Sequence, residues 1–312
     1  MKKRTLGRTG LEVAEIGFGA WAISGRGYGP TKDGESTAAL HLALDLGIDF
    51  IDTADSYGDG HSEELIGSVL EERGDTETVV ATKFGWDFYG EGGMRGNMSR
   101  DYAFFAVEQS LKRLRRDAID IYQIHNSNPH AIESDGVFET MEELKSRGYI
   151  RYWGISANYC GDGVEALKRV EPDTIQVPYS IFEQEPEEEL FPMALERNVG
   201  IIVREPLASG LLTGKYGANS TFHKRDHRRG WSREYLERGV KKYERVKFLE
   251  VPGRTMVQSA IRFSLSHPAV SVVIPGAKTT AQVEENTAAS EVSLSAQELE
   301  ELRGLYKEGF GV

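Results

Sequence analysis

The sequence is poor in cysteine and has no long apolar run. Its single cysteine is Cys160, so no disulfide can form within the chain, and a reducing compartment fits this composition. Nowhere do about eighteen apolar residues stand in succession, the length that a membrane-spanning helix requires. The opening residues 1–5 are basic, but no apolar signal-peptide core follows them. We therefore expect a cytoplasmic protein without a membrane span.

Positive charge is also scarce. The 37 Lys and Arg residues are outnumbered by 49 Asp and Glu residues, which gives a formal net charge of −12. An acidic surface repels both nucleic acids and anionic membranes. We expect neither as a partner, and the sequence leaves the oligomeric state open.

Several common ligand motifs are missing. A glycine-rich dinucleotide pattern starts at Gly17 but fails at Ala22, the position of its third glycine. His223 and His227 have metal-like spacing, yet Lys224 stands where a zinc protease motif has glutamate. A solvated basic loop is the better interpretation there, and we expect no metal.

What is present is a regular alternation of strand-like and helix-like segments. Strands are predicted near 15–20, 48–52, 78–83, 119–124, 149–155, 174–178, 199–203 and 270–274. Helices are predicted near 34–46, 62–73, 100–115, 132–147, 162–169, 187–197, 254–266, 279–289 and 295–308. Strands separated by helices form parallel sheets, and eight of them favour closure into a (β/α)8 TIM barrel.

We expect residues 1–312 to form a single α/β barrel domain with two additions. Residues 1–13 read as a β-hairpin that plugs the bottom of the barrel, and extra helices follow the last strand. Two stretches, 85–98 and 215–250, read as long loops after strands. Long loops in compact domains are usually lids or disordered segments, and loops after barrel strands lie on the catalytic face.

Chargeable groups stand at or just after the ends of three consecutive predicted strands. Asp52 ends the second strand, Tyr57 follows it, Lys83 ends the third and His125 ends the fourth. Each alone is more often structural: a packed tyrosine, an ion pair or a satisfied histidine. Together at the carboxyl ends of neighbouring strands they indicate a catalytic site.

These four residue types suit the reduction of a carbonyl group. No side chain carries a hydride, so a cofactor must supply it, and the protein supplies the proton. Tyr57 is the candidate donor, and the Lys83 ammonium is expected to lower its pKa by stabilising phenolate. Asp52 could keep Lys83 protonated, and His125 could hydrogen-bond the carbonyl oxygen.

A phosphate site is predicted near the C-terminus. Residues 272–280 read as a strand, a turn and a helix start, where backbone N–H groups attract anions, and Lys278 adds a charge. The alternative is a simple capped helix with a surface lysine. The basic segment 222–229 could fold over the same place. Two sources of positive charge near one another would favour a phosphorylated adenosine ribose, and therefore NADPH over NADH.

With these residues, the chain resembles the aldo-keto reductase family over essentially its whole length. Within it, the chain is similar to bacterial oxidoreductases related to potassium-channel β subunits. The matching segments are Asp52–Ala54 with Tyr57–Gly58 and Ser62–Glu63, Thr82–Lys83, the strand ending at His125, Gln176–Tyr179, Pro206–Tyr216 and Ile274–Gly276.

The resemblance implies an NADP(H)-dependent oxidoreductase that interconverts an aldehyde or ketone with its alcohol. Tyr57 would be the general acid/base, with Asp52, Lys83 and His125 completing a tetrad. The residues implied for the cofactor are Ala20, Trp21, Asp52, Ser156, Gln176, Arg204, Pro206, Leu207, Ser209, Lys215, Arg228, Gly276, Lys278, Gln282, Glu285 and Asn286. Arg228 is our choice over Arg225 for the lid arginine.

Substrate identity stays open. Trp21, Trp86 and Phe88 are expected to line an aromatic pocket for a small carbonyl compound, although buried structural aromatics are the alternative. A second functional hypothesis is an NADPH-binding sensor subunit with slow turnover. The channel β subunits carry asparagine where this chain has His125, which favours catalysis. A third is a barrel lyase that uses Lys83 as a Schiff base, which the neighbouring Asp52 disfavours.

Overall fold

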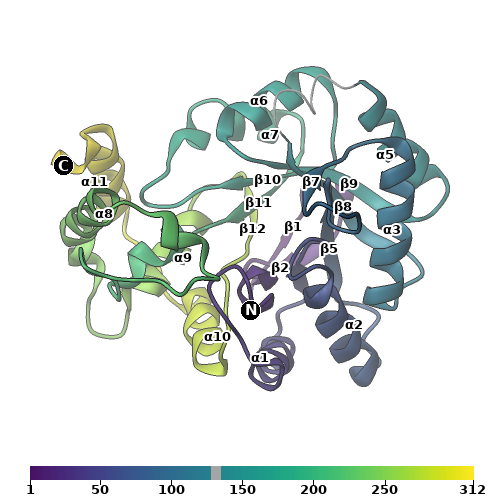
Figure 1. The fold of residues 1–312 in the computed structure, drawn as a ribbon. Coiled ribbons are helices and arrows are strands. Elements are labelled where there is room, and N and C mark those ends of the chain that lie inside the picture. Colours follow the sequence, from purple (N-terminus) through teal and green to yellow (C-terminus); the bar gives the residue numbers. More distant parts are fainter. Residues whose placement is uncertain (128–134) are drawn as a thin grey trace.

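The computed structural model describes residues 1–127 and 135–312, and it forms the expected barrel (Figure 1). Its parallel strands are ordered β3–β4–β5–β8–β9–β10–β11–β12. They are β3 (Phe18–Gly19), β4 (Phe50–Asp52), β5 (Val79–Phe84), β8 (Ile119–Ser127), β9 (Ile150–Ala157), β10 (Thr174–Pro178), β11 (Gly200–Arg204) and β12 (Val270–Val273). Backbone bridges from Ile16 to Val273 and from Gly19 to Gly276 join the first strand to the last. These bridges close the barrel.

Helices surround the strands (Figure 1). They are α1 (Asp33–Asp45), α2 (His61–Arg73), α3 (Arg100–Leu114), α5 (Asp135–Ser146), α6 (Cys160–Arg169), α7 (Leu190–Glu196), α8 (Arg233–Val246), α9 (Met256–Leu265), α10 (Thr280–Thr287) and α11 (Ala296–Lys307). Residues 132–134 of one predicted helix lie outside the described residues. Both α10 and α11 follow β12, as expected. Within the described ranges, no helix has the length and apolarity needed to cross a bilayer.

The N-terminal hairpin closes one end of the barrel, as predicted. Strands β1 (Lys3–Thr5) and β2 (Glu12–Ala14) pair antiparallel, and Leu6 between them is fully buried with side chains of the barrel interior. A Cβ on Gly7 would lie 2.1 Å from the backbone nitrogen of Gly200, so only glycine permits this close approach. The barrel is therefore closed at the end opposite the carboxyl ends of its strands.

The region predicted as a loop over 215–250 contains a helix, α8, which corrects that prediction. Ser232 begins it by accepting a hydrogen bond from the Tyr235 N–H at 3.1 Å. Leu236 and Val246 are buried at helical spacing among many charged residues. The many charged residues of this segment made its amphipathic pattern difficult to recognise in the sequence. In the other loop, β6 (Trp86–Asp87) and β7 (Arg95–Gly96) form a short antiparallel pair.

Candidate active site

A cavity of about 480 Å³ opens where the carboxyl ends of several barrel strands meet. Asp52, Arg204 and residues near the ends of β8, β9 and β10 form part of its wall. The residues singled out from the sequence that line it are Trp21, Asp52, Tyr57, His125, Ser156, Gln176, Arg204, Pro206, Leu207, Ser209, Lys215, Arg228, Gly276, Lys278 and Gln282. Most of the predicted site residues therefore share one cavity.

Lys83 lies behind this wall and connects two of the predicted tetrad residues. Its Nζ donates to Asp52 Oδ1 at 2.6 Å and to the Thr53 carbonyl at 2.6 Å, and lies 3.4 Å from the Tyr57 hydroxyl. The lysine side chain is fully buried, so its three donors meet protein partners rather than water. The geometry matches the arrangement expected from the sequence.

The pKa of Tyr57 does not follow that expectation. Burial raises the pKa of the Tyr57 phenol above its usual value of 10.0, and the opposing effect of Lys83 is too weak to reverse it. Burial lowers the pKa of Lys83, but Asp52 and Tyr57 outweigh it and raise that pKa above 10.5. Tyr57 therefore carries its proton, and Lys83 its charge, throughout the neutral range.

His125 is held in its neutral form. Burial, together with the positive charges of Lys83 and Arg204, places the pKa of His125 well below 6.5. Its Nδ1 lies 3.5 Å from the Ser56 hydroxyl, and its ring meets the Tyr57 ring edge-on at 5.6 Å. A neutral imidazole beside a phenol can exchange hydrogen bonds with an uncharged oxygen in the cavity.

Two glutamines complete the coordination of Asp52. Its Oδ2 accepts hydrogen bonds from Gln176 Nε2 at 2.6 Å and from Gln123 Nε2 at 3.3 Å. Ser156 lies at hydrogen-bond distance from Gln176, 3.5 Å away. Both carboxylate oxygens therefore have partners, which fixes the orientation of the acid that holds Lys83.

The loop after β11 has the backbone geometry of an anion site. Leu207 is right-handed, whereas Ala208 and Ser209 have φ values of +48° and +52°. A right-handed residue followed by a left-handed one turns successive N–H groups to one side, a geometry that favours anions. The Ala208 N–H is already bonded to the Glu205 carbonyl at 2.9 Å, so it is not among the free donors of this loop. Lys215 lines the same cavity and adds positive charge.

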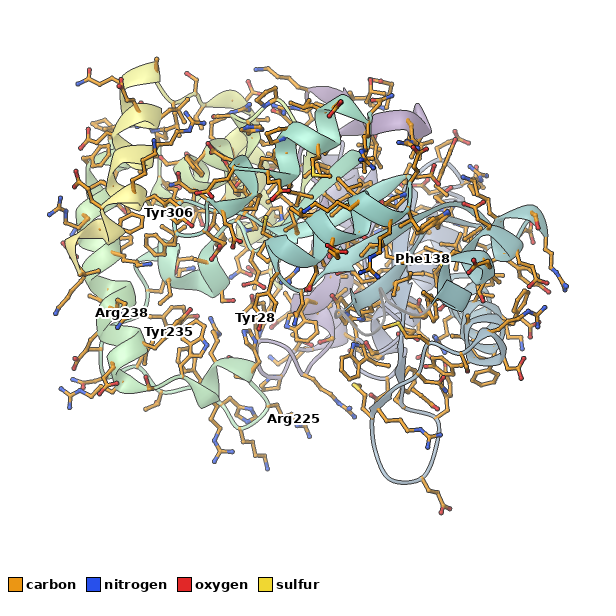
Figure 2. All side chains as sticks on the ribbon, turned by 90° about the horizontal axis from the view of Figure 1, so that it is seen from above. Tyr28, Phe138, Arg225, Tyr235, Arg238 and Tyr306 are labelled. Carbon is orange, nitrogen blue, oxygen red and sulfur yellow. The ribbon has the colours of Figure 1, made fainter. Side chains whose placement is uncertain are left out.

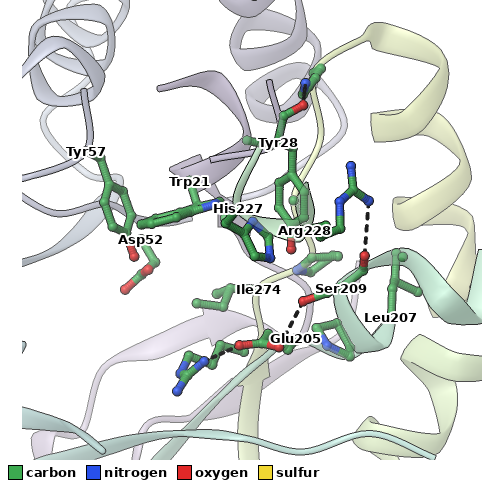
Figure 3. A pocket seen from close by; sticks show the side chains of 18 of the residues that line it. Trp21, Tyr28, Asp52, Tyr57, Glu205, Leu207, Ser209, His227, Arg228 and Ile274 are labelled. Carbon is green, nitrogen blue, oxygen red and sulfur yellow. Dashed lines mark hydrogen bonds and ion pairs between the residues drawn. The ribbon is translucent and has the colours of Figure 1, made fainter. Parts of the chain in front are cut away.

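The lid segment, residues 222–231, lies against the loop after β3. Asp226 forms a backbone bridge with Tyr28, and Arg228 is buried and lines the cavity. The Arg228 guanidinium is paired with Asp226 at 2.8 Å. It also donates to the Ser209 carbonyl at 3.1 Å (Figure 3). Arg225 is exposed at the edge of the molecule and does not line the cavity (Figure 2). The structure thus places Arg228, not Arg225, at the cavity.

The turn after β12 supplies the remaining positive charge. Lys278 donates from Nζ to the Tyr28 carbonyl, and its backbone N–H donates to Gln282 Oε1 at 2.8 Å. Asn286 does not line the cavity but donates to the Gly276 carbonyl at 3.4 Å, which supports the turn. Glu285 and Ala20 also lie outside the cavity wall.

The aromatic pocket differs from its prediction. Trp21 lines the cavity, but Trp86 and Phe88 do not. Phe88 stacks on Tyr89 with ring centroids 4.2 Å apart, and Tyr89 accepts a hydrogen bond from Arg113, so both rings have partners other than the cavity. The correction is that only the first of the three expected aromatics contributes to the wall.

Tyr28, Glu205 and His227 are among the wall residues that were missed from the sequence. Tyr28 follows the first strand closely enough that its position after β3 could have indicated it. Glu205 adopts a φ of +57°, which no sequence motif reports. His227 was seen only as half of a metal motif. Among the described residues, no group of three or more His, Cys, Asp or Glu side chains could hold a metal ion.

Comparison with known proteins agrees with this fold. The profile of the Aldo/keto reductase family matches residues 15–307. An aldo-keto reductase from Bacillus halodurans, solved in its holo form, is 32% identical, with 98% of this chain and 96% of that chain covered and a TM-score of 0.82. The chain belongs to the aldo/keto reductase family.

Two further relatives bear on the branch and the ligand. An aldo-keto reductase from Klebsiella pneumoniae in complex with NADPH is 27% identical, with 98% of this chain and 95% of that chain covered and a TM-score of 0.75. A probable voltage-gated potassium channel subunit beta from Arabidopsis thaliana is 30% identical over 94% of this chain and 92% of its own length. The predicted family and its kinship with channel β subunits are confirmed.

Proposed function

We propose that this protein uses NADP(H) to interconvert an aldehyde or ketone with its alcohol. The observation that carries the proposal is the chain of contacts from Asp52 through Lys83 to Tyr57, which ends at the wall of the cavity. A buried ion pair is costly unless its geometry is good, and this one is directed at a single hydroxyl group. Because the chain belongs to the aldo/keto reductase family, carbonyl reduction is the first reaction to test for the Tyr57 hydroxyl.

In this proposal Tyr57 gives a proton to the carbonyl oxygen during reduction and takes it back during oxidation. Its raised pKa keeps the proton on the phenol until charge develops on the substrate oxygen. Lys83 then stabilises the phenolate as it forms, because its ammonium is held 3.4 Å from the hydroxyl. Neutral His125 donates a hydrogen bond to the same oxygen and orients it.

The cavity has the features that a dinucleotide phosphate needs. Its far end combines the left-handed backbone at Ala208 and Ser209 with Lys215, Lys278 and Arg228. Ser156 and Gln176 lie at the other end with the tetrad and offer hydroxyl and amide groups for a nicotinamide amide. When bound, the cofactor supplies the hydride that no side chain can provide. The NADPH complex of the Klebsiella relative supports this choice.

The direct test is NADPH oxidation with a broad panel of aldehydes and ketones. We expect absorbance at the reduced nicotinamide band to fall with at least several of them. The absence of turnover across the whole panel, with NADPH binding intact, would overturn the reductase proposal.

Tyr57→Phe tests the identity of the acid. The variant removes only the hydroxyl, so it should bind NADPH as the parent does while turnover falls by roughly 10²–10⁴-fold. Isothermal titration measures the binding, and stopped-flow absorbance measures the turnover. If the variant reduces carbonyls at the parent rate, another group gives the proton.

The similarity to a plant potassium-channel β subunit supports a second candidate, a nucleotide-sensing subunit with slow turnover. A sensor would oxidise one equivalent of bound NADPH and then release the product cofactor slowly. Comparing the single-turnover rate with the steady-state rate separates the two functions. Equal rates favour the enzyme, whereas a fast burst followed by slow cycling favours the sensor.

A further inference from the structure

Trp21 is packed between the proposed acid and the lid segment. Its indole meets the Tyr57 ring edge-on, with centroids 4.7 Å apart and planes at 87°. On its other side the His227 ring lies 6.2 Å away, and Figure 3 shows Trp21 between the two. The indole is 37% exposed, so burial alone does not fix its orientation.

Gly27 is the residue that makes this orientation possible. A Cβ at position 27 would lie 1.9 Å from the Trp21 Nε1, far inside contact distance. The indole therefore rests directly on the Gly27 backbone. Gly27 does not need a left-handed φ, so its lack of a side chain is required by contact rather than by backbone conformation.

The backbone between these two residues is held in place. The Ser24 hydroxyl donates to the Trp21 carbonyl at 2.8 Å and accepts from the Gly27 N–H at 3.3 Å. The turn that carries Tyr57 packs against the same loop, since a Cβ on Gly58 would lie 2.6 Å from the Ser24 carbonyl oxygen. A methyl group at position 27 would consequently displace the indole rather than the loop.

The Gly27 carbonyl also connects this loop to the lid segment. It accepts the His227 N–H at 3.0 Å and lies 2.8 Å from His227 Nδ1. Two bonds to one oxygen fix both the backbone and the imidazole of His227, with the ring proton on Nδ1. The position of the lid segment is thereby tied to the residue beneath Trp21.

Resting on the proposed function, we propose that Gly27 is a positioning residue that holds Trp21 against Tyr57 and couples this contact to the lid segment through His227. The coupling makes the substrate side of the cavity and its lid one mechanical unit. Displacing the indole removes one wall of the substrate space next to the reacting hydroxyl. Misplacement by about 1 Å is enough to reduce turnover by roughly 10²-fold.

Gly27→Ala tests this inference, with Gly230→Ala as its matched control. Gly230 lies on the lid segment, and a Cβ there would meet nothing within 4 Å. The chain has 4 tryptophans, so protein labelled with 5-fluorotryptophan gives few fluorine signals, and Trp21→Phe identifies the relevant one. We expect Gly27→Ala to shift the Trp21 signal and lower kcat/KM by roughly 10–100-fold, and Gly230→Ala to change neither.

A double-mutant comparison isolates the contact. In a Trp21→Ala background, Gly27→Ala should change kcat/KM by less than about 2-fold, because the group it displaces is gone. An equal loss in both backgrounds, or an unshifted Trp21 signal in Gly27→Ala, overturns the inference.

If Gly27→Ala fails to fold, His227→Ala replaces it, since removing the imidazole should also move the Trp21 signal. An unmoved signal there overturns the coupling. The fluorine spectra need no turnover, so they decide the positioning role even if the protein reduces no carbonyl compound.

Discussion

Asp52 ends β4 and Asp55 follows it by three residues, yet their surroundings differ completely. Asp52 accepts hydrogen bonds from Lys83, Gln123 and Gln176 inside the barrel. Asp55 is fully buried, and neither of its carboxylate oxygens has a side-chain hydrogen-bond partner within the described part of the chain. The same side chain is therefore fully hydrogen-bonded at position 52, whereas at position 55 it is buried without side-chain hydrogen bonds.

The groups around Asp55 disfavour its charged form. Burial first, and then the charge of Glu63, raise the pKa of Asp55 well above 3.8. Arg113 opposes this rise, but it is engaged with Glu63 at 2.7 Å. The Tyr122 hydroxyl, whose pKa is raised by burial and by Asp55, also lacks a partner among the described residues. A carboxylic acid here is favoured in its neutral form.

Removing Lys83 should break the satisfied cluster and have the largest effect. Lys83→Met leaves Asp52 buried without its cation, so we expect a loss of about 3–5 kcal/mol in unfolding free energy and near-complete loss of turnover. Urea unfolding and NADPH oxidation measure the two. Lys32→Met is the control, because that side chain is 82% exposed. Unchanged stability in Lys83→Met would show that the ion pair contributes nothing.

Asp55→Asn should raise the unfolding free energy, in contrast to Lys83→Met. The folded state raises the pKa of Asp55, so the folded state binds its proton more tightly than the unfolded chain does. Stability therefore falls as pH rises above about 4, and the neutral asparagine escapes this loss. We expect the variant to be about 1–3 kcal/mol more stable at pH 7–8, with the gain shrinking toward pH 4.

Thermal unfolding of Asp55→Asn and the parent protein across that pH range measures the effect, with NADPH oxidation as a check on the site. Turnover should stay within a few-fold of the parent, because Asp55 does not line the cavity. A gain that does not change with pH would point to a cause other than titration of Asp55.

The protonation state of His125 provides a test on the Asp52 side of the comparison. Its lowered pKa means that it should remain neutral as pH falls from 7.5 to 6.0, so protonation of His125 should not reduce turnover over that range. NMR chemical shifts of the imidazole groups measure the protonation state of His125 directly, and the His125→Asn variant identifies which signals belong to it. Titration of the His125 signals near pH 6.5 would contradict the effect of burial and of Lys83 and Arg204.

Tyr122→Phe should have the smallest effect. Its hydroxyl is buried without a partner, so its removal should change the unfolding free energy by less than about 0.5 kcal/mol. Tyr179→Phe is the matched comparison, because the Tyr179 hydroxyl bonds Glu187 and its loss should cost about 1 kcal/mol. Equal costs for the two variants would mean that Tyr122 has a partner in solution.

Much of the barrel could be predicted because its strands are buried, β-branched runs. The prediction failed at α8, where charged residues conceal the buried spacing of Leu236 and Val246. It also failed for the acidity of Tyr57, because burial depends on residues distant in sequence. The pairing of Asp52 with Lys83 could be predicted from the sequence, whereas the burial of Asp55 without a side-chain partner depends on the three-dimensional arrangement.

The closed end of the barrel has a kinetic consequence. The cavity lies at the carboxyl ends of the strands and the hairpin around Leu6 closes the opposite end, so cofactor and substrate would enter from the same face of the barrel. Whichever ligand lies deeper must then arrive first and depart last. Closure of the opposite end by β1 and β2 would in this way favour an ordered sequence of ligand binding and release.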